Sequence, residues 1–160
     1  MRLGVVSDSH GHVELVRPAI RMLESLEVDV VLHCGDIGSA AVVKLFAAWP
    51  THFVFDNCDA DRPGLAAAID AAGHTCHGEF GELEIDGRRI ALLHSDDHRR
   101  FKQALSSGEW DLMCYGHTHV AAIERHGRTL ALNPGALYRA NPHSLAIVDL
   151  PELEATFVTL

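Results

Sequence analysis

The stretch that decides the fold reads VDVVLHCGDIGS, residues 28–39. Its apolar run from Val28 to Cys34 predicts a buried β-strand, and Gly35-Asp36 predicts the turn that ends this strand. Ser39 then stands where a helix N-cap belongs, and the helix is predicted over residues 40–49 because Pro50 would end it. A strand followed directly by a helix is the repeating unit of an α/β fold.

The same unit recurs on either side of this stretch, and hairpins follow it. Apolar runs between turn residues predict strands, and apolar residues at helical spacing predict helices. Pro18 predicts either a kink in the first helix or a helix that begins near Arg17. In chain order, the predicted elements are strand 2–7, helix 13–26, strand 28–34, helix 40–49, strand 52–56, helix 61–72, strands 80–85 and 89–93, helix 98–107, and strands 111–115, 120–124, 129–132, 145–150 and 153–160. Such an order indicates an α/β protein whose sheets mix parallel and antiparallel strands.

The composition sets limits on the function. The chain has 160 residues, of which 48% are apolar and 22% charged, so we expect a single globular domain over residues 1–160. No apolar run approaches the roughly 18 residues of a membrane span, and the apolar run at the N-terminus is too short for a signal peptide. We therefore expect a cytoplasmic protein with no membrane partner and with reduced cysteines. The net charge of -9 argues against binding to long nucleic acids.

Five predicted strands are each followed at once by side chains that bind metals. These side chains are Asp8 and His10, Asp36, Asn57, His94, and His117 with His119. Singly, each has an ordinary explanation, such as a helix-entry turn for Asp36 or a core histidine for His94. Together, in this order, they are hard to produce by structural accident. The carboxyl ends of strands converge where α/β sheets bind ligands, so we expect these groups to meet.

Seven such groups exceed the four that one tetrahedral ion needs. They fit two divalent ions that share a bridging carboxylate, with Asp36 as the bridge because it follows a central strand. Two ions about 3.5–4 Å apart bind the attacking oxygen and the leaving oxygen of a phosphoryl transfer, and they lower the pKa of a bound water toward about 7. Nitrogen and oxygen ligands without thiolate favour manganese, and they also accept iron, nickel or zinc.

The motifs resemble those of the calcineurin-like metallophosphoesterases, and especially their small bacterial and archaeal phosphodiesterase branch. The matching motifs are Asp8-Ser9-His10, Gly35-Asp36, Asp56-Asn57-Cys58-Asp59, His94-Ser95-Asp96, Gly116-His117-Thr118-His119 and Asn133-Pro134-Gly135-Ala136. The resemblance implies an α/β fold of four layers, a sandwich of two mixed β-sheets flanked by α-helices. It implies one ion held by Asp8, His10, Asp36 and His119. It implies a second ion held by Asp36, Asn57, His94 and His117.

Three further acidic groups and one histidine are expected beside the metals, where they would contact the ligands or the substrate. They are Asp59, Asp96, Asp97 and His98. Among them Asp59 is a candidate catalytic residue, together with Asp36, Asn57 and His94, which would act through metal and phosphate. Asp97 has a second interpretation as the N-cap of the helix over residues 98–107.

Departures from the family pattern shape the functional hypothesis. Asp56 and Ser95 replace glycines, Ala136 replaces a serine, and Cys58 replaces the histidine that protonates the leaving oxygen in strong phosphatases. A thiol of pKa about 8.5 is a poor substitute acid. The hypothesis is therefore an enzyme in which a metal-bound hydroxide attacks phosphodiesters or activated phosphate esters rather than unactivated monoesters.

The expected partner is a small phosphate-ester substrate, and a homo-oligomer is compatible with the sequence. Two alternatives stay open. The first is a non-catalytic metal-binding or scaffold protein on the same fold, as in the retromer subunit of this family, although that interpretation predicts eroded metal ligands. The second is a nuclease, which would need a basic groove.

Overall fold

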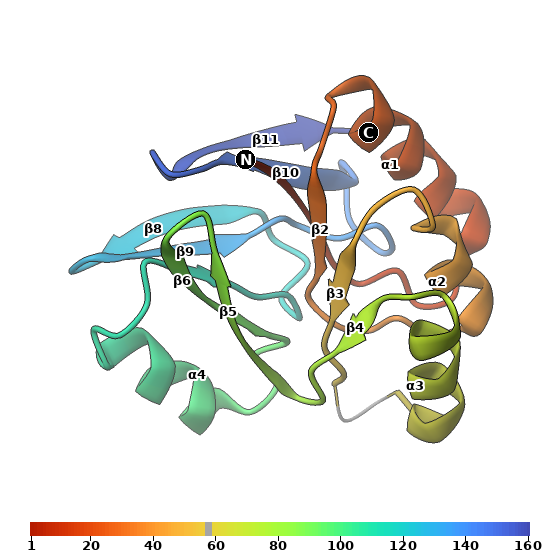
Figure 1. Ribbon diagram of the computed structural model, residues 1–160, viewed down its shortest axis with the longest axis horizontal. Helices are drawn as coiled ribbons and strands as arrows, with labels where there is room; N and C mark the ends of the chain where they lie inside the picture. The colour runs from red at the N-terminus through yellow and green to blue at the C-terminus, as the bar shows by residue number, and fades with distance from the viewer. Residues whose placement is uncertain (57–58) are drawn as a thin grey trace.

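The computed structural model describes residues 1–56 and 59–160, and its strands and helices alternate first and then give way to hairpins (Figure 1). The elements in chain order are β1 (Arg2–Val6), α1 (Val13–Ser25), β2 (Val30–His33), α2 (Ala40–Leu45), β3 (Thr51–Phe53), α3 (Arg62–Ala71), β4 (Thr75–Cys76), β5 (Phe80–Ile85), β6 (Arg88–Leu93), α4 (His98–Ser106), β7 (Leu112–Cys114), β8 (Ala122–His126), β9 (Thr129–Asn133), β10 (Ser144–Asp149) and β11 (Glu154–Thr159).

These strands form two sheets, and both sheets are mixed. The first sheet has the order β11-β10-β1-β2-β3-β4, in which β1 to β4 run parallel and β10 and β11 run antiparallel to their neighbours. The second has the order β5-β6-β7-β9-β8, with β6, β7 and β9 parallel and an antiparallel strand at each edge. The predicted pair of mixed sheets is confirmed.

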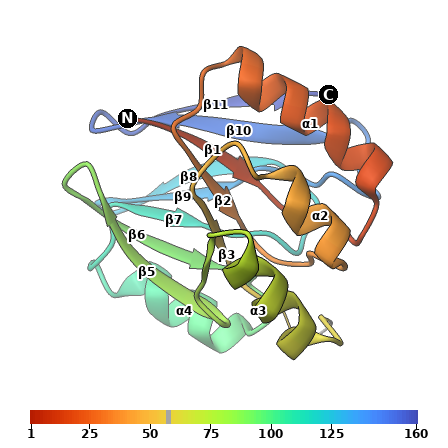
Figure 2. The same cartoon turned by 45° about the vertical axis from the view of Figure 1, so that its right-hand side comes forward.

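The apolar side chains sort into three buried layers because successive residues of a strand face opposite sides of its sheet. Leu3 and Val5 of β1 lie in the cluster between the two sheets, whereas Val6 lies in the cluster under α1, α2 and α3. Likewise Leu92 of β6 faces the first sheet, whereas Leu93 packs in a third cluster under α4. Three helices thus cover one outer face and α4 covers the other, which gives the predicted four layers (Figures 1 and 2).

Side-chain caps and tight turns start and end the elements as the sequence predicts. The side chains of Ser39, Asp61 and Asp97 accept hydrogen bonds from the backbone N–H groups three residues later, at 3.4, 3.0 and 3.0 Å. Asp86 and Gly87 both have positive φ, at 51° and 72°, as the two-residue hairpin between β5 and β6 requires.

Several predicted boundaries are wrong. The helix predicted over residues 40–49 ends at Leu45, and only turns follow, although Phe46 and Trp49 remain buried. The third strand covers Thr51–Phe53 rather than residues 52–56, because the chain leaves the sheet early. α1 begins at Val13 with Pro18 inside it, so the later start near Arg17 is wrong. Within the part of the chain that the structure describes, no helix is both long and apolar enough to cross a membrane.

Candidate metal centre

The candidate ligands follow the carboxyl ends of strands in both sheets. Asp8 follows β1 and Asp36 follows β2 in the first sheet, whereas His94 follows β6 in the second. His117 and His119 come shortly after β7, which pairs in parallel with β6. Asn57, the remaining candidate, lies outside the described residues. The centre therefore lies where parallel strands of two different sheets end.

Four of the groups predicted to hold one ion come together. One ligand atom each from Asp8, His10, Asp36 and His119 lies within 4.8 Å of the others. The Nε2 atom of His10 is 3.1 Å from Asp36 Oδ2 and 3.8 Å from Asp8 Oδ1. The Nε2 atom of His119 is 3.1 Å from the same Asp8 oxygen. This set matches the four residues that the family resemblance implies for the first ion.

A second group shares Asp36 with the first. It contains ligand atoms of Asp36, Asp56 and His94 within 4.8 Å of one another. His94 Nε2 is 3.3 Å from Asp36 Oδ2, and the ring of His117 packs edge-on against His94 with 5.2 Å between the centroids. Asp56 is not among the predicted ligands. Its signal in the sequence is its position after a strand end, directly before Asn57.

The hydrogen bonds of two histidines leave their Nε2 atoms facing carboxylates. His94 Nδ1 bonds the carbonyl oxygen of Cys34 at 2.8 Å, and His119 Nδ1 bonds that of Arg139 at 3.2 Å. A carbonyl only accepts, so Nδ1 carries the proton and Nε2 presents a lone pair when the ring is neutral. Metal-bound histidines have this arrangement, in which the remote N–H is fixed by a carbonyl.

Several buried atoms at this place have no hydrogen-bond partner among the described residues. They are Asp8 Oδ1, His10 Nε2 and His94 Nε2. Buried polar atoms are nearly always paired, so an unpaired group of nitrogen and oxygen ligands pointing inward indicates a site for a cation. The residues present therefore fit a divalent metal centre.

The pKa shifts of the candidate ligands also indicate a site that attracts positive charge. Burial raises the pKa of Asp8, and the nearby charge of Asp36 adds to this effect. Burial alone would lower the pKa of His94, but the adjacent carboxylates of Asp36 and Asp8 raise it to about 9. For Asp36, burial would raise the pKa, yet the adjacent His94 ring and Asp56 carboxyl group hold it well below its usual range. These carboxylates attract positive charge, whether a proton on histidine or a metal ion.

The backbone is strained at most of these positions. Asp8, His10, Asp36, His117 and His119 have φ of 56°, 46°, 54°, 74° and 59°, in the left-handed region that L-residues rarely adopt. Such conformations cost roughly 1–2 kcal/mol each and cluster at functional sites, where the surrounding structure enforces them. Two of these positions are joined directly, because His10 N–H donates to the Asp36 carbonyl at 2.8 Å and so links the loop after β1 to the loop after β2.

The other polar residues predicted near the metals make contacts with backbone groups and with a neighbouring ring. The Oδ1 atom of Asp59 accepts a hydrogen bond from Gly38 N–H at 3.1 Å, so its carboxylate ties the loop after β2 to the loop after β3. Burial, with the charge of Asp56, raises the Asp59 pKa to about 6. Asp97 caps α4, and His98 stacks on Phe101 at 6.4 Å. A catalytic role for Asp59 stays a prediction.

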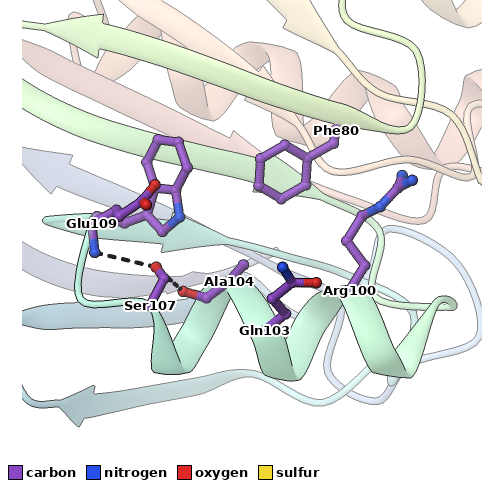
Figure 3. A pocket seen from close by; sticks show the side chains of 7 residues that line it. Phe80, Arg100, Gln103, Ala104, Ser107 and Glu109 are labelled. Carbon is purple, nitrogen blue, oxygen red and sulfur yellow. Dashed lines mark hydrogen bonds between the residues drawn. The ribbon is translucent and has the colours of Figure 1, made fainter.

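Two hollows lie on the α4 side of the centre. The first has a volume of about 240 Å³ and is lined by His94 together with Glu79, Leu93, Ser95, Asp96, Asp97 and Arg100. With three carboxylates and one guanidinium, this pocket would repel a phosphate unless cations were bound beside it. The second is a groove of about 410 Å³ over α4, lined by Phe80, Trp110 and residues of α4 that include Arg100 and Gln103; no candidate ligand lines it (Figure 3).

Comparisons with known proteins define the class of this chain. Residues 1–152 match the family model described as the calcineurin-like phosphoesterase superfamily domain. The protein named Phosphodiesterase MJ0936 of Methanocaldococcus jannaschii is 29% identical over 165 residues, which cover 100% of this chain and 99% of that protein. The solved structure of an archaeal phosphodiesterase superposes with a TM-score of 0.92 at 28% identity, and each chain is covered completely.

The class is thus that of the phosphoesterases, as the motifs predict. The chain belongs to the calcineurin-like phosphoesterase superfamily. Vps29 of Chaetomium thermophilum, with a TM-score of 0.70 at 11% identity over 100% of this chain and 97% of its own, shares the fold. At that identity the likeness shows the fold alone.

Proposed function

We propose that this chain is a dinuclear metal-dependent phosphodiesterase that acts on small diesters or activated phosphate esters. The observation that carries the proposal is the pair of ligand groups that share Asp36, one with Asp8, His10 and His119 and one with Asp56 and His94. A shared carboxylate between two ligand groups is the arrangement that two-metal phosphoryl transfer needs. The word phosphodiesterase, printed both for the relative and for the solved structure that are similar over the whole chain, supports the choice of substrate class.

The residues have distinct roles in this proposal. Bound divalent ions, with manganese favoured and iron, nickel or zinc as alternatives, would acidify the attacking water and neutralise the phosphate oxygens. Asp36 holds the two halves of the centre together, whereas the Cys34 and Arg139 carbonyls orient His94 and His119. The histidine that protonates the leaving oxygen in strong phosphatases is replaced by Cys58, so the leaving group must be stable as an anion.

The substrate is proposed to be small and the protein to act in the cytoplasm. The pocket beside His94 carries more negative than positive side chains, which disfavours long polyanions, and the net charge of -9 extends this argument to the whole chain. A scaffold role has no observation of its own, because the likeness to Vps29 shows only a shared fold.

The test is hydrolysis of a bis-aryl phosphate by manganese-loaded protein, compared with a mono-aryl phosphate, before and after chelation. Chelation should abolish activity on the diester, and metal return should restore it. Asp36→Asn should lose at least about a hundredfold in rate, since it removes the shared ligand. Asp70→Asn, an exposed aspartate of α3, is the matched control and should keep the wild-type rate. Diester hydrolysis that persists after chelation, or that persists in the Asp36→Asn variant, would refute the proposal.

A further inference from the structure

Asp56 occupies a position that is glycine in the family motif, and glycine has no side chain with which to bind a metal. We propose that in this chain the Asp56 carboxylate is an additional ligand of the ion assigned to Asp36 and His94. The inference rests on the proposed metal centre and deepens it, because it changes the charge and the donor set of one of its two positions.

The geometry places Asp56 at the centre. One of its carboxylate oxygens lies within 4.8 Å of a ligand oxygen of Asp36 and of a ring nitrogen of His94. The residue is only 2% exposed, so this carboxylate does not face bulk water. His94 is 1% exposed, and its Nε2 atom, 3.3 Å from Asp36 Oδ2, has no hydrogen-bond partner among the described residues. An imidazole lone pair and two carboxylates therefore surround a common point.

Three buried acidic side chains lie together around Asp56. Asp36, Asp56 and Asp59 are 9%, 2% and 5% exposed, and the carboxyl group of Asp56 interacts with those of the other two. The nearby guanidinium of Arg62 donates to the backbone carbonyl of Asp56 at 2.5 Å, which leaves its positive charge off the carboxylate. Buried carboxylates in contact are unfavourable unless a proton or a metal ion lies between them. A divalent ion at this point satisfies both the carboxylates and His94.

Asp56 also has a structural role, which the experiment must separate from metal binding. Its Oδ1 atom accepts a hydrogen bond from Asp59 N–H at 2.8 Å, and its own N–H donates to Asp59 Oδ2 at 3.3 Å. Asp56→Asn keeps an acceptor for Asp59 N–H and removes the charge. Asp56→Gly installs the residue of the family motif and removes the side chain.

The measurement is calorimetric titration of Mn²⁺ into metal-free protein, with elemental analysis of the product and thermal unfolding of each metal-free variant. Wild-type protein should bind two ions. Asp56→Asn should bind one of them at least about tenfold more weakly and the other unchanged, because loss of even an outer-shell partner costs tenfold or more. Asp56→Gly should do the same, and Asp70→Asn should match the wild type. Metal-free Asp56→Asn should unfold at the wild-type temperature or above, since a buried charge is gone.

Other outcomes overturn the inference in distinguishable ways. If Asp36→Asn loses metal but Asp56→Asn and Asp56→Gly bind both ions with wild-type affinity, the metal centre stands and Asp56 is not a ligand. If metal-free Asp56→Asn unfolds at a lower temperature while its metal affinities are unchanged, Asp56 serves only the turn. If wild-type protein binds no divalent ion, the proposed centre fails, and this inference fails with it.

Discussion

Replacing Gly38 with alanine should lower both stability and metal affinity, because the backbone of the loop after β1, which contains His10 and Gly11, lies directly against this glycine. Gly38 has φ of +84°, and a Cβ built on it would lie 2.3 Å from the backbone nitrogen of Gly11 and 2.4 Å from the carbonyl carbon of His10. Both are main-chain atoms, which cannot rotate away as a side chain does. The loops must therefore separate, although His10 N–H and Gly11 N–H hydrogen-bond the loop after β2 at 2.8 and 2.9 Å.

The magnitude has two parts. A left-handed conformation costs an alanine roughly 1–2 kcal/mol, and forcing extra volume into a packed place costs about 1–3 kcal/mol more. Gly38→Ala should therefore lose roughly 2–5 kcal/mol of unfolding free energy, which lowers Tm by roughly 5–15 °C in a chain of this size. Gly73→Ala is the matched control, because Gly73 has φ of +75° but no atom within 4 Å of the place that a Cβ would take. Gly73→Ala should therefore lose only the roughly 1–2 kcal/mol that the left-handed conformation costs an alanine.

The assay is thermal unfolding of the metal-free proteins, followed by Mn²⁺ titration at a temperature where both variants are folded. Gly38→Ala should bind the ion proposed at His10 at least about tenfold more weakly, whereas Gly73→Ala should bind it as the wild type does. Equal losses of stability in the two variants would refute the steric argument. Wild-type metal affinity in Gly38→Ala would refute the dependence of the site on the contact between the two loops.

Three further predictions concern pH, the ion pair of Asp111 and the leaving group. Burial lowers the pKa of His33 to about 3, so the unfolded chain takes up the proton first, and the contribution of His33 to stability falls as pH drops below about 6.5; in urea unfolding of metal-free protein, the change in stability from pH 7 to 5 should be less favourable in the wild type than in His33→Gln by roughly 2 kcal/mol, and equal changes in the two proteins would contradict this. The buried Asp111 carboxylate accepts hydrogen bonds from Arg89 N–H at 2.9 Å and from the exposed Arg128 side chain at 2.5 Å, and Asp111→Ala should cost about 2 kcal/mol in the same assay, whereas a change below about 0.5 kcal/mol would contradict a stabilising role for these bonds. Cys58→His should raise kcat on mono-aryl phosphates about tenfold or more, and the diester rate less, because a histidine can protonate a poorer leaving group; an equal change on both would contradict this interpretation.

The fold could be predicted largely from local signals. Strand and helix patterns separate well where apolar runs are short and turn residues bound them, as in β2 and the β5–β6 hairpin. The two residues of β4 carry no periodic pattern, so their pairing with β3 could not be predicted. The end of α2 at Leu45 could not be predicted either, because Phe46 and Trp49 remain buried and extend the apolar spacing beyond the helix. Strand order depends on contacts between distant segments, which local patterns do not contain.

The candidate site could be predicted to a similar extent and for a related reason. Asp8, Asp36 and His94 each follow a strand, so the rule that strand ends converge brings them together without further information. Asp56 follows the same rule, but the family pattern has a glycine there and so gives no reason to expect a ligand. The direction of its carboxylate depends on the turn with Asp59, and a sequence pattern does not specify this turn.

The proposed ligands come from both sheets, so metal binding at the centre and the stability of the sandwich would be thermodynamically linked. Asp8 and Asp36 extend from one sheet, whereas His94 and His119 extend from the other. Ions held across that junction act as a cross-link, and a ligand at a thousand times its Kd stabilises the folded state by about 4 kcal/mol. Because the ions bind only the folded form, a substitution in the apolar layer between the sheets, such as Leu32→Ala, lowers the apparent metal affinity under conditions where it leaves part of the protein unfolded. The apparent metal affinity therefore depends on the stability of the apolar layer that joins the two sheets, as well as on the ligand groups.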